Sequence, residues 1–136
     1  MKEAFEKYNV KGELVVDHED YKIWDNTTLK TFTISNVLLK AGKKTYSHQH
    51  PFNDEIYIFH SGTGHMILER EDEGSVQRDQ IDVKPGSIVL VDGRQEHQTF
   101  NTSDTDMQFT MIYDNIGRPP ADIEGIEKGD KPYTGE

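Results

Sequence analysis

Cysteine is absent from this chain of 136 residues. Without thiols, the protein has no disulfide framework, no thiolate zinc site and no cysteine nucleophile. Basic residues are few, because 15 Lys and Arg stand against 25 Asp and Glu, and the formal net charge is -10. A chain this acidic lacks the positive surface that attracts nucleic acids and anionic membranes, so we expect neither as a partner.

Long apolar runs are missing as well. Only 33% of the residues are hydrophobic, and no run approaches the roughly 20 apolar residues that span a bilayer. The first residues, MKEAFEKYNVKG, lack the apolar centre of a signal peptide. We therefore expect a cytoplasmic location, and we expect one domain because this length suits a single core.

Short segments rich in β-branched and aromatic residues are what the chain does contain. They alternate with turn clusters such as EDEGS, KPG and NTSDTD, and no interior segment has a convincing helical period. This pattern predicts an all-β sandwich or barrel. The expected strands cover residues 13–17, 21–25, 31–39, 45–50, 55–60, 65–70, 77–83, 87–91, 97–101 and 107–113.

One strand and the C-terminal end add detail to this prediction. The segment 31–39 begins by alternating Phe32 and Ile34 with Thr and Ser, which indicates a half-buried strand. Residues 114–136 hold three of the five prolines and many charges. We predict that residues 1–113 form the domain, with its first strands as an N-terminal extension, and that residues 114–136 form an arm or tail.

Four residues have side chains suited to a metal ion. His48 and His50 lie two positions apart, so on a strand they project from one face. A turn at PFND would bring Glu55 back to the same volume, and His97 begins a later strand. Three imidazoles and a carboxylate suit one divalent transition metal such as Mn, Fe, Zn, Ni or Co. A lone His-x-His pair is more often a surface pair, and the spacing alone leaves that alternative open.

The spacing of Gly42, His48, His50, Glu55 and Gly62 matches a known motif at every position, G-x5-H-x-H-x4-E-x6-G. In this segment the chain resembles the cupin superfamily. The resemblance implies an all-β double-stranded β-helix, or jelly-roll barrel, that holds a metal ion.

A second cupin motif is matched less fully. Gly86, His97 and Asn101 are in place, whereas Asp92 and Arg94 stand where the family usually has proline and glycine. The resemblance implies that His97 completes a four-ligand site with the two histidines and the glutamate of the first motif.

Within the superfamily, the chain is loosely similar to the cupin part of mannose-6-phosphate isomerases. The similarity rests on Trp24, Gly42, Ser47 and the segment DEIYIFHSGTGHM. It favours a metal-dependent isomerase or epimerase of a sugar or sugar phosphate, in which His60 or Tyr57 would carry the proton. A non-haem Fe(II) dioxygenase and a non-catalytic small-molecule-binding protein are the alternatives.

Two further residues are candidates for contacting a small-molecule ligand. Arg94, on the loop before His97, would hold an anionic group, although a solvent-facing Arg94 is the alternative. Thr99 should share the face of His97 by strand alternation. We also expect a homodimer in which the strands before Lys30 help to cover the exposed edges of a small jelly roll.

Overall fold

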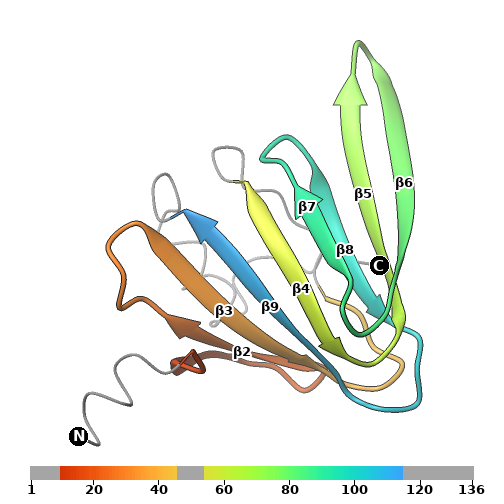
Figure 1. The fold of residues 1–136 in the computed structure, drawn as a ribbon. Coiled ribbons are helices and arrows are strands. Elements are labelled where there is room, and N and C mark those ends of the chain that lie inside the picture. The colour runs from red at the N-terminus through yellow and green to blue at the C-terminus, as the bar shows by residue number, and fades with distance from the viewer. Residues whose placement is uncertain (1–9, 46–53, 115–136) are drawn as a thin grey trace, which may run out of the picture.

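The computed structural model describes residues 10–45 and 54–114 (Figure 1). These residues form strands and no helix, so the described part of the chain contains no helix capable of crossing a membrane. The strands are β1 Glu13–Asp17, β2 Tyr21–Asn26, β3 Phe32–Leu39, β4 Glu55–Ser61, β5 Gly64–Asp72, β6 Ser75–Val83, β7 Ile88–Val91, β8 Glu96–Asn101 and β9 Met107–Asp114.

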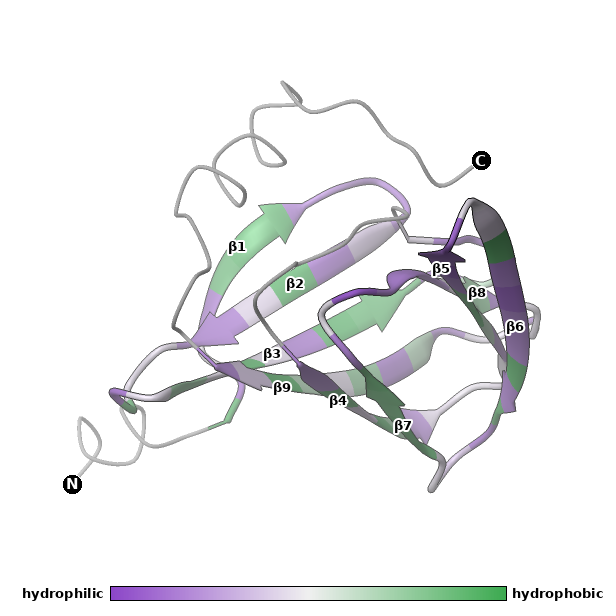
Figure 2. Cartoon of the chain, turned by 90° about the horizontal axis from the view of Figure 1, so that it is seen from above, coloured by the Kyte–Doolittle hydropathy of each residue, from purple (hydrophilic) through white to green (hydrophobic). Residues whose placement is uncertain are grey.

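Two antiparallel sheets face each other as the walls of a barrel, which Figure 2 shows from above. The larger sheet has the order β1-β2-β3-β9-β4-β7, and the smaller has the order β6-β5-β8. The predicted all-β jelly-roll architecture is confirmed. Of the predicted strand 45–50, only Thr45 lies within the described residues, and the predicted arm lies outside them except for Asp114.

The inner face of the larger sheet is set by strict alternation along its strands. On β4, Glu55, Tyr57 and Phe59 are buried, whereas Ile56 is exposed. On β9 and β3, the odd-numbered residues are likewise buried, and Thr110 is the one even-numbered residue of these two strands that is also buried. Because side chains i and i+2 share a face, the odd-numbered positions of these three strands line the interior.

The core fills one end of this interior with stacked aromatic rings. The ring centroids of Phe59 and Phe109 lie 5.1 Å apart, and those of Tyr57 and Phe109 lie 5.7 Å apart. Leu39, Met66 and Met107 are fully buried around them. The other end of the interior carries the polar residues described below.

The turn from β4 to β5 has no space for side chains at two positions, and both are glycine. A Cβ on Gly62 would lie 2.8 Å from the Cα of Met107, and Gly62 has a φ of 82°. A Cβ on Gly64 would lie 1.9 Å from the carbonyl oxygen of Phe100. The close approach of β8 and β9 therefore requires that both residues have no side chain.

A two-residue turn joins β5 to β6. Asp72 pairs with Ser75, and the central residues Glu73 and Gly74 have φ values of 50° and 81°, as a type I′ hairpin turn requires. The hairpin extends past the neighbouring strands in Figure 1. Along β6, every residue is exposed except Val83.

Candidate metal site

Glu55 and His97 meet inside the barrel. Glu55 is the first residue of β4 and His97 is the second residue of β8, and both strands begin at the same end of the molecule (Figure 1). Glu55 Oε2 and His97 Nε2 lie 3.3 Å apart, and both side chains are almost completely buried. Two of the four predicted ligands are thus brought together from opposite sheets.

The backbone fixes which nitrogen of His97 faces the carboxylate. His97 Nδ1 lies 3.3 Å from the carbonyl oxygen of Gln95, which can only accept a hydrogen bond, so Nδ1 is the donor. In the neutral imidazole, the Nε2 lone pair then faces Glu55. A nitrogen lone pair and a carboxylate oxygen at this separation fit a shared cation, because two ligands about 2.1 Å from an ion and 90° apart are about 3.0 Å from each other.

The other two predicted ligands, His48 and His50, lie outside the described residues. Within residues 10–45 and 54–114, no group of three or more His, Asp or Glu side chains is arranged to hold a metal ion. The described residues on either side of the gap are Thr45 and Asp54. The Thr45 N–H donates to the carbonyl oxygen of Thr99 at 2.9 Å, and Asp54 directly precedes Glu55.

Thr99 lies on the same face of β8 as His97 and is 1% exposed. Its backbone N–H donates to Thr45 Oγ1 at 3.0 Å, so Thr45, the last described residue before the gap, is attached to β8. A role for its side chain in binding substrate stays a prediction.

Tyr57 and His60, the two predicted proton carriers, occupy opposite faces of β4. The ring of Tyr57 meets His97 edge-on, with centroids 5.7 Å apart. The side chain of His60 lies on the outer face, where Nε2 is 2.7 Å from Thr110 Oγ1. The structure therefore places Tyr57 beside the Glu55–His97 pair and does not bring His60 to it, because His60 is five positions from Glu55 on an alternating strand.

A buried polar network that the sequence reasoning missed lines the inner wall next to Glu55. Tyr113 on β9 pairs in register with Glu55 on β4. The Tyr113 hydroxyl lies 2.9 Å from Ser35 Oγ, and Ser35 Oγ donates to Asp25 Oδ1 at 2.5 Å. Since the single Ser35 proton is directed at Asp25, Tyr113 donates to Ser35. Three strands thus supply a continuous chain of hydrogen bonds from tyrosine to carboxylate.

The position of Ser35 also shows which side of β3 faces inward. Thr33 and Ser35 are buried, whereas Phe32 is 48% exposed. The predicted alternation is present, but its hydroxyl-bearing side faces the interior. The small hydroxyl residues in a strand of otherwise large side chains were the available signal for a polar interior wall.

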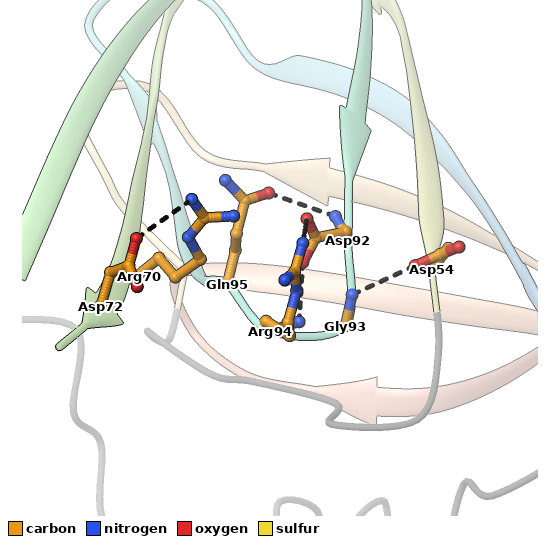
Figure 3. A network of polar contacts seen from close by, with 7 residues as sticks. All are labelled: Asp54, Arg70, Asp72, Asp92, Gly93, Arg94 and Gln95. Carbon is orange, nitrogen blue, oxygen red and sulfur yellow. Dashed lines mark hydrogen bonds and ion pairs between the residues drawn. The ribbon is translucent and has the colours of Figure 1, made fainter.

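Arg94 lies on the loop between β7 and β8 in an exposed network (Figure 3). Its guanidinium Nη2 is 3.3 Å from Asp92 Oδ2, and its side chain is 73% exposed. The backbone N–H of Arg94, 2.8 Å from Asp92 Oδ1, lowers the pKa of Asp92, and the nearby guanidinium adds to this effect. In this structure, the carboxylate that Arg94 contacts belongs to Asp92, and contact with an anionic ligand stays a prediction.

Arg70 is a second cation near the Asp92–Arg94 pair, and the sequence did not mark it as a candidate. It follows Met66 and Leu68 on the same side of β5, and Leu68 pairs in register with His97. Its Nη2 lies 3.9 Å from Asp72 Oδ2 (Figure 3). Strand alternation from the buried Met66 and Leu68 was the signal that could have identified it.

Comparison with known proteins identifies the family of the chain. The Cupin domain family model matches residues 35–113, so the chain belongs to the cupin family. Glucose-6-phosphate isomerase of Thermococcus litoralis is 31% identical over 119 residues, which cover 82% of this chain and 60% of that protein. The enzyme of the same name from Pyrococcus abyssi is 31% identical over 112 residues, covering 76% of this chain and 58% of that protein.

The chain spans about three fifths of the length of these two curated relatives. Among solved structures, oxalate decarboxylase of Bacillus subtilis, a protein with Mn(II) centres, is similar in fold. It superimposes with a TM-score of 0.66 at 19% identity, over 76% of this chain and 28% of that chain. At this identity, the likeness shows the fold alone.

Proposed function

We propose that this protein is a metal-dependent isomerase of a sugar or sugar phosphate. The observation that carries the proposal is the buried Glu55–His97 pair beside an inner wall of hydroxyl and carboxylate groups. The likeness to two enzymes named glucose-6-phosphate isomerase supports the choice of reaction.

The proposed metal ligands are His48, His50, Glu55 and His97. A divalent ion held there would supply Lewis-acid polarisation of adjacent oxygens of a hydroxy-aldehyde or hydroxy-ketone. Glu55 contributes a negative charge that favours a cation, and the Gln95 carbonyl orients His97 so that Nε2 is directed inward. Mn, Fe, Zn, Ni and Co are all compatible with this ligand set.

The proposed proton-carrying group is the Tyr113–Ser35–Asp25 chain, with Tyr57 packing against His97. When Tyr113 accepts a proton from a substrate hydroxyl, its own proton can pass to Ser35, and the Ser35 proton can pass to Asp25. Each oxygen then gains one proton and loses one, except Asp25, which ends protonated. His60 is assigned no part in this transfer because its side chain lies on the outer face.

The charge of the inner wall favours a hydroxyl-rich part of the ligand next to the site. Among the inward-facing positions of the described strands β2, β3, β9, β4 and β7, the charged residues are Asp25 and Glu55, and none is Lys or Arg. A phosphate group would therefore face the open end of the barrel, where Arg94 would have to exchange Asp92 for the ligand. Thr99, which is buried on the inner face of β8, stays a proposed contact for the part of the ligand inside the barrel.

The test combines metal analysis with an isomerase assay. Protein purified without a metal-affinity column should contain close to one divalent ion per chain and, when loaded with each candidate metal, should interconvert glucose 6-phosphate and fructose 6-phosphate. The double variant His50→Ala/His97→Ala should lose both properties, and His60→Ala should keep both. Stoichiometric metal in the double variant would refute the ligand assignment.

The alternatives predict different results in the same samples. Metal-dependent O2 uptake without sugar isomerisation would favour a non-haem Fe(II) dioxygenase. Saturable binding of sugar phosphates with no turnover would favour a non-catalytic binding protein. The cytoplasmic location and the division between residues 1–113 and 114–136 also remain predictions.

A further inference from the structure

The outer face of the larger sheet carries a row of polar side chains that begins at a tryptophan. Trp24 pairs in register with Asn36, and Asn36 pairs with Thr110, so the row crosses β2, β3 and β9. Trp24 directly precedes the inward-facing Asp25, so strand alternation places it on the outer face. The row therefore lies on the side of the sheet opposite the proposed metal site.

His60 joins this row at a bulge in β4. Phe59 pairs with Phe109 and Ser61 pairs with Gln108, so His60 is an extra residue between two successive pairs. Bulges re-aim a side chain and are over-represented next to functional sites. At this bulge, the His60 side chain lies on the outer face, and the proposed catalysis gives it no part.

The hydrogen bonds of the row run in one direction. The Thr110 hydroxyl donates to Asn36 Oδ1 at 2.7 Å, so His60 Nε2, 2.7 Å from Thr110 Oγ1, is the donor to Thr110. Asn36 Nδ2 donates in turn to the carbonyl oxygen of Val10 at 2.8 Å. The row thus attaches the segment that precedes β1 to the outer face of the sheet.

A cavity of about 410 Å³ lies over this row. Trp24 and Leu38 contribute aromatic and apolar surface to its lining. Lys11, the residue after the attached Val10, also lines it and has its Nζ 5.0 Å from the centre of the Trp24 ring. Small-molecule sites have volumes of roughly 300–1,000 Å³ and combine such surface with a few placed polar groups.

The charge of this cavity differs from that of the protein as a whole. Among the described residues, Lys11 and His60 line the cavity, and no Asp or Glu does. By contrast, the cavity that Arg70 and Arg94 line is also lined by four carboxylate side chains. In a chain with a net charge of -10, a cation in a cavity without carboxylates favours an anionic ligand at that place.

We propose that this cavity binds a small carboxylate that carries a flat apolar ring. The ring packs against the indole of Trp24 and the side chain of Leu38, and the carboxylate lies within reach of Lys11 Nζ. The hydrogen-bonded row fixes the wall that carries Lys11. The inference is independent of the proposed catalysis, because none of these residues faces the interior of the barrel.

The first test uses Trp24 as the reporter, because it is the one tryptophan of the chain. The full-length protein is titrated with benzoate, with benzamide as the uncharged probe and acetate as the probe without a ring, and calorimetry measures the heat of binding in parallel. Benzoate should change the Trp24 emission saturably, with a dissociation constant at least about 10-fold lower than those of the other two probes. No saturable change in emission or heat with benzoate, or equal binding of benzamide, would overturn the proposal.

The second test locates the carboxylate with variants of Lys11. Lys11→Met keeps the length of the side chain and removes its charge, so it should weaken benzoate binding about 10-fold, and Lys11→Arg should retain most of the affinity. The matched control is Lys84→Met, which removes the same charge from the exposed turn between β6 and β7 and should bind benzoate as the wild type does.

Metal removal distinguishes this cavity from the interior of the barrel. Protein dialysed against a chelator should bind benzoate as tightly as untreated protein, whether or not the proposed isomerase activity exists. Loss of benzoate binding after this dialysis would place the probe at a metal ion and overturn the proposal. Equal benzoate affinity of Lys11→Met and the wild type would overturn it as well.

Discussion

The two faces of strand β4 have different chemistry and different neighbours. Glu55, Tyr57 and Phe59 face inward, where they meet His97 and the aromatic core. Ile56 and Ile58 face outward. Seven consecutive residues thus contribute to the proposed metal site, the core and the outer surface, and alternation alone separates these roles. On this fold, the role of a residue can therefore be assigned only after it is known whether its side chain faces the interior or the outer surface of the sheet.

The largest expected effect comes from removing the inner carboxylate. Glu55→Gln keeps the shape of the side chain and removes its charge, so the metal affinity should fall by more than about 100-fold, since even losing a residue that only supports a ligand typically costs 10–100-fold. The measurement is metal content after dialysis against a chelator. Glu96→Gln is the control, because Glu96 is exposed on β8 directly before His97. Equal metal retention by the two variants would contradict the inner site.

The next largest effect is on stability. It is measured by comparing substitutions of two neighbouring residues on opposite faces of β4. Phe59→Ala removes a ring that is 1% exposed and packed against Phe109, and should lower the free energy of unfolding by about 3–5 kcal/mol. Ile58→Ala removes a half-buried side chain and should cost about 1 kcal/mol. Urea unfolding at one fixed protein concentration measures both values. A cost for Ile58→Ala as large as that for Phe59→Ala would show that the outer face is as closely packed as the inner one.

A smaller effect on stability should distinguish two hydroxyl groups on β9. Tyr113→Phe removes the inner hydrogen bond to Ser35, and Thr110→Val removes the outer ones to His60 and Asn36. Each change should cost about 1 kcal/mol of stability. Only Tyr113→Phe should also lower the isomerase kcat, by about 100-fold. If the two variants have equal kcat, the Tyr113–Ser35–Asp25 chain has a structural role alone.

The smallest effect concerns the exposed Asp92–Arg94 pair. The pKa of Asp92 is lowered from its ordinary value of 3.8, chiefly by the backbone N–H of Arg94. The unfolded chain therefore binds the Asp92 proton more tightly than the folded chain does. The stabilisation is present above the ordinary pKa and is lost as the pH falls through the lowered one. Because the pair is exposed, it should be worth less than about 1 kcal/mol.

Asp92→Asn tests this small contribution through the pH dependence of urea unfolding. The variant should show a slightly flatter loss of stability below pH 4 than the wild-type protein, and the two should have parallel curves between pH 6 and pH 8. A difference that appears only near neutral pH would point to another titrating group.

Most of the fold could be predicted from local sequence pattern, whereas the face on which a side chain lies was harder to predict. Turn residues between β-rich segments predicted nine of the nine described strands, with most boundaries within one or two residues. The cupin spacing identified Glu55 and His97, which the structure brings to 3.3 Å although 41 residues separate them. His60 has the residue type of a proton carrier, but it is an odd number of positions from Glu55 on β4, so its side chain lies on the opposite face of the strand.

The hydroxyl residues of β3 were a signal for a polar inner wall, but their hydrogen-bond partners could not be predicted because they depend on three-dimensional pairing. Asp25, Ser35 and Tyr113 lie on β2, β3 and β9, and β9 is next to β3 in the sheet although β4 to β8 come between them in the chain. Moreover, Phe32 and Ile34 are the larger apolar residues at the start of β3, and an apolar-inside rule would face them inward. They face outward, where Ile34 pairs with Ile112.

The exposed hairpin of β5 and β6 has a consequence for how the molecule opens. Strand β6 pairs with β5 along one edge, and its residues from Ser75 to Asp82 are all exposed. In contrast, β9 is held between β3 and β4 and contributes four core side chains. Amide protons of β6 should therefore exchange with solvent through a local opening that leaves the barrel intact, whereas those of β9 should exchange only when the whole domain unfolds. Among the described strands, the hairpin is then where a protease should first cut the folded protein.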